Sequence, residues 1–296
     1  MGGARKRTVI RTPDGRSLDA WIADPADGIP LVYHFGTPGA GLPYPPFVDV
    51  LAARGLRWVS FSRPGYGSST RRPGRRVADV AADTAAVLDS IGAERAYVAG
   101  WSGGGPHALA CAALLPERVI AAASLAGVAP YPADGLDWLA GMGAENVVEF
   151  QAALEGPEAL IKFKESAWPT FRDITASEVA AAFGDLVDEV DRASATTGPV
   201  ASFLADLFHE ALREGYWGWF DDDMAFTKPW GFDLGSIRRP VHVWQGPHDR
   251  MVPFAHGEWL VANVGGACAH LHAEHGHISL VVDSFAAIVD ALLDGS

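Results

Sequence analysis

The chain has 296 residues, of which 49% are hydrophobic and 20% charged, enough apolar material for one large domain or one domain with an inserted subdomain. Its 36 acidic and 23 basic side chains give a net charge of −13, which argues against nucleic acid and anionic membranes as partners. The two cysteines, Cys111 and Cys268, indicate neither a disulfide framework nor a metal site.

The N-terminus is basic, but no apolar run follows it, so we expect no signal peptide. No uninterrupted apolar stretch approaches the length of a membrane span. The sequence therefore predicts a cytoplasmic protein that acts away from membranes, and it leaves the oligomeric state open.

The first half of the chain alternates apolar runs with helical patterns. We expect strands at 8–11, 17–23, 30–34, 56–62, 97–99 and 119–125, and helices at 46–54, 77–91 and 108–115. Strands that alternate with helices pair in parallel and are covered on both faces. The order therefore predicts a mostly parallel sheet between two layers of helices.

The alternation stops at Gly127 and resumes only near residue 241. Between these points we expect helices at 136–154, 157–166, 176–194, 200–214 and 219–226. Further strands are expected at 241–245 and 269–272, with helices at 254–264 and 280–293. We therefore predict an eight-stranded α/β core made of 1–129 and 234–296, with a helical cap inserted at 130–233.

Ser102 lies at the centre of a Gly-x-Ser-x-Gly pattern, between an expected strand and an expected helix. Gly100 and Gly104 leave room for a sharp turn, which would lift the serine hydroxyl clear of the backbone. The alternative is an ordinary glycine-rich turn from strand to helix. The context favours a nucleophilic serine.

A serine nucleophile needs a base and a group that orients the base. Asp249 follows the strand at 241–245, although it could also be a turn aspartate that caps the next helix. His277 lies after the last strand and directly before the last helix, with His275 as its rival. His107 is close to Ser102 in sequence but is expected to point away from the site. We predict a triad of Ser102, Asp249 and His277.

With these residues in this order, the chain resembles α/β-hydrolase-fold serine hydrolases that carry a helical cap, in the epoxide-hydrolase-like and haloperoxidase-like esterase group. The resemblance covers nearly the whole chain. Its specific parts are the Gly-Trp-Ser-Gly-Gly-Gly turn, the Gly-Thr-Pro-Gly loop at 36–39, the Arg-Pro-Gly-Tyr-Gly turn at 63–67, the stretch 249–253 and the pair Gly276-His277.

The fold places oxyanion donors on the backbone. One is the N–H of Gly103, and the second is expected from Thr37 or Gly36 in the loop after the third strand. Phe35 stands where the family usually has a histidine and cannot make the polar contacts of that histidine, so the choice of the second donor stays open. Relatives that act on epoxides or haloalkanes use an aspartate as the nucleophile, whereas the serine of this chain favours acyl transfer.

We therefore expect an enzyme that hydrolyses a carboxylic ester, lactone or thioester of a small apolar or aromatic substrate, through an acyl-enzyme on Ser102 and without cofactor or metal. The expected pocket residues are Trp101, Phe35, Trp217, Trp219 and Phe220. The sequence leaves two other functions open: a cofactor-free lyase or oxygenase that uses the same serine and histidine, and a ligand-binding receptor with a relict triad.

Overall fold

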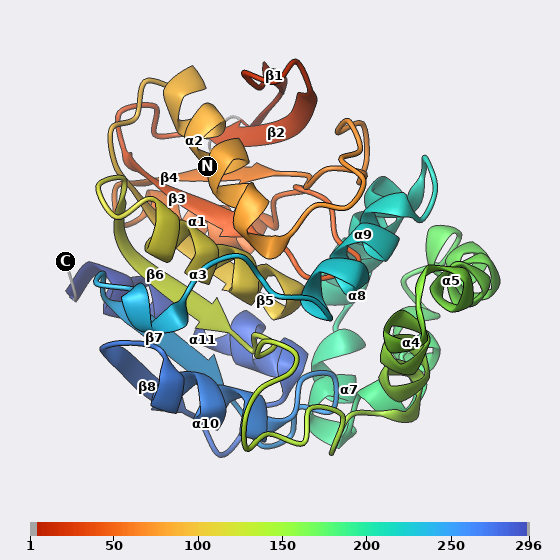
Figure 1. The fold of residues 1–296 in the computed structure, drawn as a ribbon. Coiled ribbons are helices and arrows are strands. Elements are labelled where there is room, and N and C mark those ends of the chain that lie inside the picture. Colours follow the sequence, from red (N-terminus) through yellow and green to blue (C-terminus); the bar gives the residue numbers. More distant parts are fainter. Residues whose placement is uncertain (1–4, 295–296) are drawn as a thin grey trace.

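The eight strands form one mixed sheet (Figure 1), and the computed structural model describes residues 5–294. The strands are β1 (Arg5–Arg11), β2 (Ser17–Ala23), β3 (Ile29–His34), β4 (Leu56–Phe61), β5 (Ala96–Trp101), β6 (Val119–Leu125), β7 (Val241–Gln245) and β8 (Ala267–Leu271). Their order in the sheet is β1-β2-β4-β3-β5-β6-β7-β8. The pairs β1–β2 and β2–β4 are antiparallel and the others are parallel, as predicted for the sheet.

Helices cover both faces of this sheet. Those of the core are α1 (Pro45–Ala52), α2 (Val80–Ser90), α3 (Gly105–Leu114), α10 (Phe254–Asn263) and α11 (His277–Asp294). Side chains of α1 and α11 pack with Tyr97 and Ala99 of β5, whereas side chains of α2, α3 and α10 pack with Val98. Neighbouring residues of a strand face opposite sides of the sheet, so β5 is buried along its whole length.

The segment between β6 and β7 contains the helices α4 (Ala144–Glu155), α5 (Pro157–Arg172), α6 (Val179–Ala182), α7 (Glu189–Ala195), α8 (Gly198–Leu212) and α9 (Trp217–Phe226). We call residues 144–226 the helical insertion. Figure 1 shows it, in green and cyan, to one side of the sheet. The division into a core of 1–129 and 234–296 and a cap of 130–233 stays a proposal, and residues 1–4 and 295–296 lie outside the described residues.

Two predicted helices of the insertion differ from the structure. The helix expected at 136–154 begins only at Ala144, because Gly141 has a φ of +88° and Gly143 is extended before the first turn. The helix expected at 176–194 is broken into α6, a short 3-10 helix and α7, with Gly184 at a φ of +52° between them. Backbone with positive φ suits glycine and interrupts a right-handed helix.

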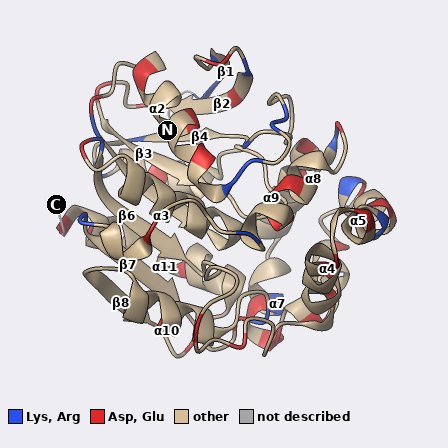
Figure 2. Cartoon of the chain, viewed as in Figure 1, with Lys and Arg blue, Asp and Glu red and all other residues tan. Residues whose placement is uncertain are grey.

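Charged residues lie on both the α/β core and the helical insertion. Figure 2 shows Asp and Glu spread over the core helices and over the helical insertion. Among the residues that the structure describes, no helix is both long enough and apolar enough to cross a bilayer.

Candidate active site

The turn that carries Ser102 is sharp and leaves no room for a side chain at Gly100 or Gly104. Ser102 begins a short 3-10 helix directly after β5, and its φ of 57° lies in the left-handed region, a strained conformation for a residue with a side chain. A Cβ added to Gly104 would lie 2.0 Å from the carbonyl oxygen of His34, and one added to Gly100 would lie 2.0 Å from the carbonyl oxygen of Gly104. The glycines therefore make the turn possible.

The loop after β3 lies against this turn. A Cβ added to Gly36 would lie 3.2 Å from Cβ and 3.6 Å from Oγ of Ser102. A Cβ added to Gly103 would lie 2.3 Å from Oγ1 of Thr37. The structure thus brings Gly36, Thr37 and Gly103 together around Ser102, where backbone N–H groups could hold an oxyanion.

His277 is the first residue of α11, and its ring lies against Asp249. The Nδ1 atom of His277 lies 2.8 Å from Oδ2 of Asp249, and both side chains are buried. Asp249 also accepts hydrogen bonds from Gln245 Nε2 at 2.9 Å and from the backbone N–H groups of Met251 and Val252 at 2.9 and 2.7 Å. These bonds hold the carboxylate in place, so His277 donates through Nδ1 and keeps Nε2 free as an acceptor.

A second acid, Asp191 of α7, fixes the backbone of His277. Its carboxylate accepts hydrogen bonds from the N–H groups of His277, Ile278 and Ser279 at 2.5, 3.0 and 3.0 Å. It thus caps α11 from the helical insertion, since these N–H groups have no partner within the helix. Gly276 is needed beside it, because an added Cβ would lie 2.5 Å from the Asp191 carboxyl carbon. No pattern in the sequence indicated this contact.

The surroundings of His277 shift its pKa. Burial lowers it, but the charge of Asp249, the hydrogen bond to Asp249 and the charge of Asp191 outweigh burial, and the pKa is raised above 6.5. Burial also raises the pKa of Asp191, against the hydrogen bonds that it accepts. The histidine is therefore a stronger base than an isolated imidazole.

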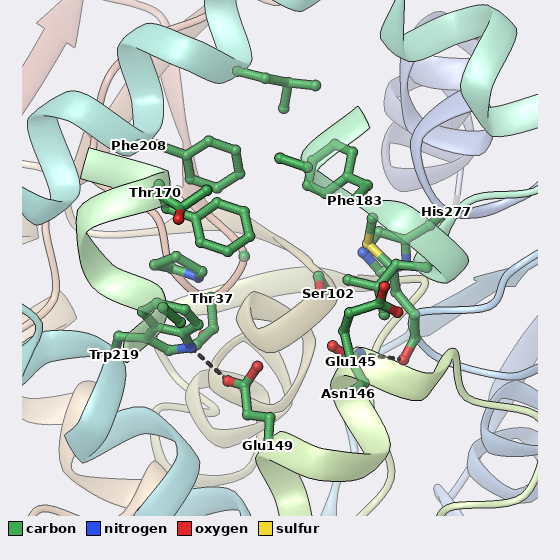
Figure 3. Close-up of a pocket in the computed structure, with 18 of the residues that line it drawn as sticks. Thr37, Ser102, Glu145, Asn146, Glu149, Thr170, Phe183, Phe208, Trp219 and His277 are labelled. Carbon is green, nitrogen blue, oxygen red and sulfur yellow. Dashed lines mark hydrogen bonds between the residues drawn. The ribbon is translucent and has the colours of Figure 1, made fainter. Parts of the chain in front are cut away.

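Ser102 and His277 line the same cavity, of about 520 Å³. Figure 3 shows both side chains at its edge, with Phe183 and Phe208 on one side and Glu149 on another. Within residues 5–294, no hydrogen bond joins Ser102 Oγ to His277, and such bonds are often long in a site without substrate. His275 and His107 are not among the described lining residues, and His107 Nδ1 lies 2.7 Å from the carbonyl oxygen of Gly103, behind the turn.

Of the five aromatic residues expected in the pocket, two line the cavity and three do not. Trp101 and Trp219 line the cavity. Phe35, Trp217 and Phe220 are not among the described residues that line it, so these three assignments are corrected. Phe35 packs its ring against Tyr33 and Phe203 in the core, Trp217 lies on the surface under the Arg71 guanidinium, and Phe220 packs against Leu160. Helices α4, α5 and α8 supply most of the remaining wall.

A buried ion pair joins α9 to the turn after β4, and its hydrogen bonds extend to the loop after β3. Arg63, in the Arg-Pro-Gly-Tyr-Gly turn, donates to the carbonyl oxygens of Phe35 and Gly36 at 2.5 and 2.9 Å and to Asp222 Oδ2 at 2.6 Å. Thr37 Oγ1 donates to the same Asp222 oxygen at 2.8 Å. The helical insertion therefore holds the loop that faces Ser102.

The fold and the turn at Ser102 define a class of protein. Residues 29–160 match the family model described as alpha/beta hydrolase fold. The whole chain superposes on epoxide hydrolase A of Mycobacterium thermoresistibile with a TM-score of 0.71, at 20% identity over 99% of each chain. The chain therefore has the α/β-hydrolase fold, which confirms the predicted fold, and over residues 29–160 it resembles the family of that name.

Two curated relatives extend over most of the sequence. The chain is 26% identical to a 2-hydroxy-6-oxononadienedioate/2-hydroxy-6-oxononatrienedioate hydrolase of Klebsiella pneumoniae, over 89% of this chain and 86% of that protein. It is also 26% identical to a non-heme chloroperoxidase of Streptomyces lividans, over 83% of this chain and 84% of that protein. Proteins similar to this chain thus carry the names of different activities, and only the site can decide among them.

Proposed function

We propose that the protein is a serine hydrolase that cleaves a carboxylic ester, lactone or thioester of a small, mainly apolar substrate. The observation that carries the proposal is the 2.8 Å contact between His277 Nδ1 and Asp249 Oδ2, beside a cavity that Ser102 also lines. A histidine held in this tautomer beside a strained serine supports nucleophilic catalysis.

Each group has a role in this proposal. Ser102 Oγ attacks the carbonyl carbon while His277 Nε2 takes its proton, and Asp249 stabilises the imidazolium that forms. The N–H groups of Gly103 and of Thr37 or Gly36 hold the oxyanion. His277 then protonates the leaving group, which departs to leave an acyl-enzyme on Ser102. Water, activated by the same histidine, releases the acid, and no cofactor is needed.

The lining of the cavity argues against the substrate named for the Klebsiella relative. A dienedioate carries two carboxylates, which need cationic partners in a buried site. None of the described residues that line the cavity is Lys or Arg, and two of them, Glu145 and Glu149, are acidic. The aromatic and aliphatic remainder favours an apolar skeleton.

The first test measures hydrolysis of 4-nitrophenyl esters of increasing acyl length, together with labelling by a fluorophosphonate. We expect both to be lost in Ser102→Ala and kept in Ser90→Ala, which removes an exposed serine on α2. Turnover that survives in Ser102→Ala would refute the acyl-enzyme. A folded wild-type protein with neither turnover nor labelling would favour the lyase, oxygenase or receptor functions instead.

A further inference from the structure

Three helices of the insertion each bring one charged side chain to a buried cluster at the wall of the cavity: Glu149 of α4, Lys164 of α5 and Asp223 of α9. Lys164 Nζ donates to Glu149 Oε1 at 2.6 Å and forms a second ion pair with Asp223. Trp219 Nε1 donates to the same Glu149 oxygen at 2.6 Å, and Lys164 Nζ lies 3.5 Å above the Trp219 ring.

The cluster holds more acid than base. Two carboxyl groups share the single ammonium of Lys164, and Lys164 and Asp223 are fully buried. Burial raises the pKa of Asp223 well above its ordinary value, the Lys164 ammonium opposes the rise, and the neighbouring Glu149 adds to it. Two ionised carboxylates therefore carry one negative charge more than the single ammonium of Lys164 balances.

The two carboxyl groups also border open space beside the nucleophile. A second, smaller cavity of about 50 Å³ is lined by Glu149 and Asp223 together with Ser102, Thr37 and Gly103. Asp223 Oδ1 is buried and, within residues 5–294, has no hydrogen-bond partner. The two hydrogen bonds of Glu149 both use Oε1, and Figure 3 shows its other oxygen directed into the larger cavity.

We infer that Glu149 and Asp223 form an ammonium-binding subsite beside Ser102, and that the substrate carries a basic nitrogen on an otherwise apolar skeleton. An ammonium balances the second carboxylate and donates hydrogen bonds to oxygens that accept none, and any proton held by the two carboxyl groups then leaves to solvent. A neutral hydroxyl supplies only the donor. A carboxylate is repelled by Glu149 and by Glu145, which lines the same cavity. The substrate part of this inference rests on the proposed function, whereas amine binding does not.

The test uses three esters that differ only at the end of the acyl chain: 4-nitrophenyl 6-aminohexanoate, heptanoate and hydrogen pimelate. At pH 7 these end in an ammonium, a methyl group and a carboxylate. We expect Glu149→Gln to lower kcat/KM for the amino ester about tenfold or more, since a charge-assisted hydrogen bond is lost. Hydrolysis of the heptanoate should fall much less than hydrolysis of the amino ester, and circular dichroism shows separately whether the variant is folded. The pimelate should gain relative to the heptanoate.

The matched control is Glu155→Gln, which removes the same charge from an exposed position on the same helix. It should leave the ratio of amino ester to heptanoate unchanged. An equal fall of both esters in Glu149→Gln would overturn the inference, because it would show that the residue only supports the wall. An equal change of the ratio in both variants would overturn it as well, because it would then reflect the net charge of the chain.

A binding measurement separates this inference from the proposed function. In the Ser102→Ala background, calorimetry with 6-phenylhexylamine and its neutral match 6-phenylhexanol needs no turnover. We expect Glu149→Gln to weaken binding of the amine about tenfold and to leave binding of the alcohol unchanged. If no ester is hydrolysed but the amine still binds through Glu149, only the hydrolase proposal fails. If esters are hydrolysed but Glu149→Gln leaves amine binding unchanged, only the proposed subsite is refuted.

Discussion

Asp222 offers the sharpest test of how the insertion supports the site. Its carboxylate is fully buried and lies 2.6 Å from the guanidinium groups of both Arg63 and Arg75, which are also buried. It accepts further hydrogen bonds from Tyr66 Oη and Thr37 Oγ1, each at 2.8 Å. In Asp222→Asn the shape is kept, but two buried cations lose the negative charge that offsets them.

The expected loss is large. Removing one partner of a buried ion pair costs about 3–5 kcal/mol, because the remaining charge stays buried. For domains of moderate size each kcal/mol lowers Tm by about 2–4 °C, so the variant should lose roughly 6–20 °C. Because Arg63 and Thr37 hold the loop that we propose to supply an oxyanion donor, kcat should fall while KM changes little.

The assay is thermal unfolding followed by circular dichroism, with ester hydrolysis measured well below Tm. The matched control is the neighbouring Asp221→Asn, which breaks the pair between Asp221 and Arg71. The Arg71 side chain is 29% exposed, so water can solvate its charge when the pair is lost, and a smaller loss follows. Equal losses of Tm in the two variants would refute the argument that unpaired buried guanidinium groups carry the effect.

Three further predictions concern the nucleophile and its base. The pKa of His277 is raised mainly because Asp249 outweighs burial, and the base must be neutral, so kcat/KM should rise with pH through an apparent pKa above 6.5. The Asp249→Asn variant should shift this rise to lower pH and reduce kcat by roughly 10³–10⁴-fold. A pH profile that does not shift in the variant would contradict this prediction. The Asp191→Ala variant should lose about 1–2 kcal/mol of unfolding free energy in urea, because the helix cap is lost, and should lower the apparent pKa of His277. An unchanged pH profile would show that Asp191 acts only as a helix cap. Gly103→Ala should push away Thr37 and reduce kcat about 100-fold or more in the ester assay, and activity within tenfold of wild type would argue against an oxyanion site there.

The site residues that stand shortly after strands of the sheet could be predicted from the sequence. The turn around Ser102 has its glycines at fixed neighbouring positions, and Asp249 and His277 each follow a strand of the sheet after a short loop. The structure brings Ser102 and His277 to the edge of one cavity and places Asp249 against His277. Sequence order was informative here because parallel strands deliver their carboxyl ends to one edge of the sheet.

Contacts between distant parts of the chain could not be predicted. Asp191 caps a helix that begins 86 residues later, and Asp222 pairs with Arg63 across 159 residues. In α9 the sequence showed aromatic residues but not which face of the helix would meet the cavity. Each residue turns about 100° around a helix axis, so Trp219 lines the cavity while its neighbour Phe220 packs elsewhere.

The two aspartates that reach from the insertion into the core limit how this enzyme could be re-engineered. Asp191 fixes the start of the helix that carries His277, and Asp222 fixes the loop that faces Ser102. A chimaera that takes its insertion from another protein of the α/β-hydrolase fold would lose both anchors unless the donor segment supplies them at matching positions. Exchange of specificity by grafting whole insertions therefore requires that these two carboxylates be transplanted first.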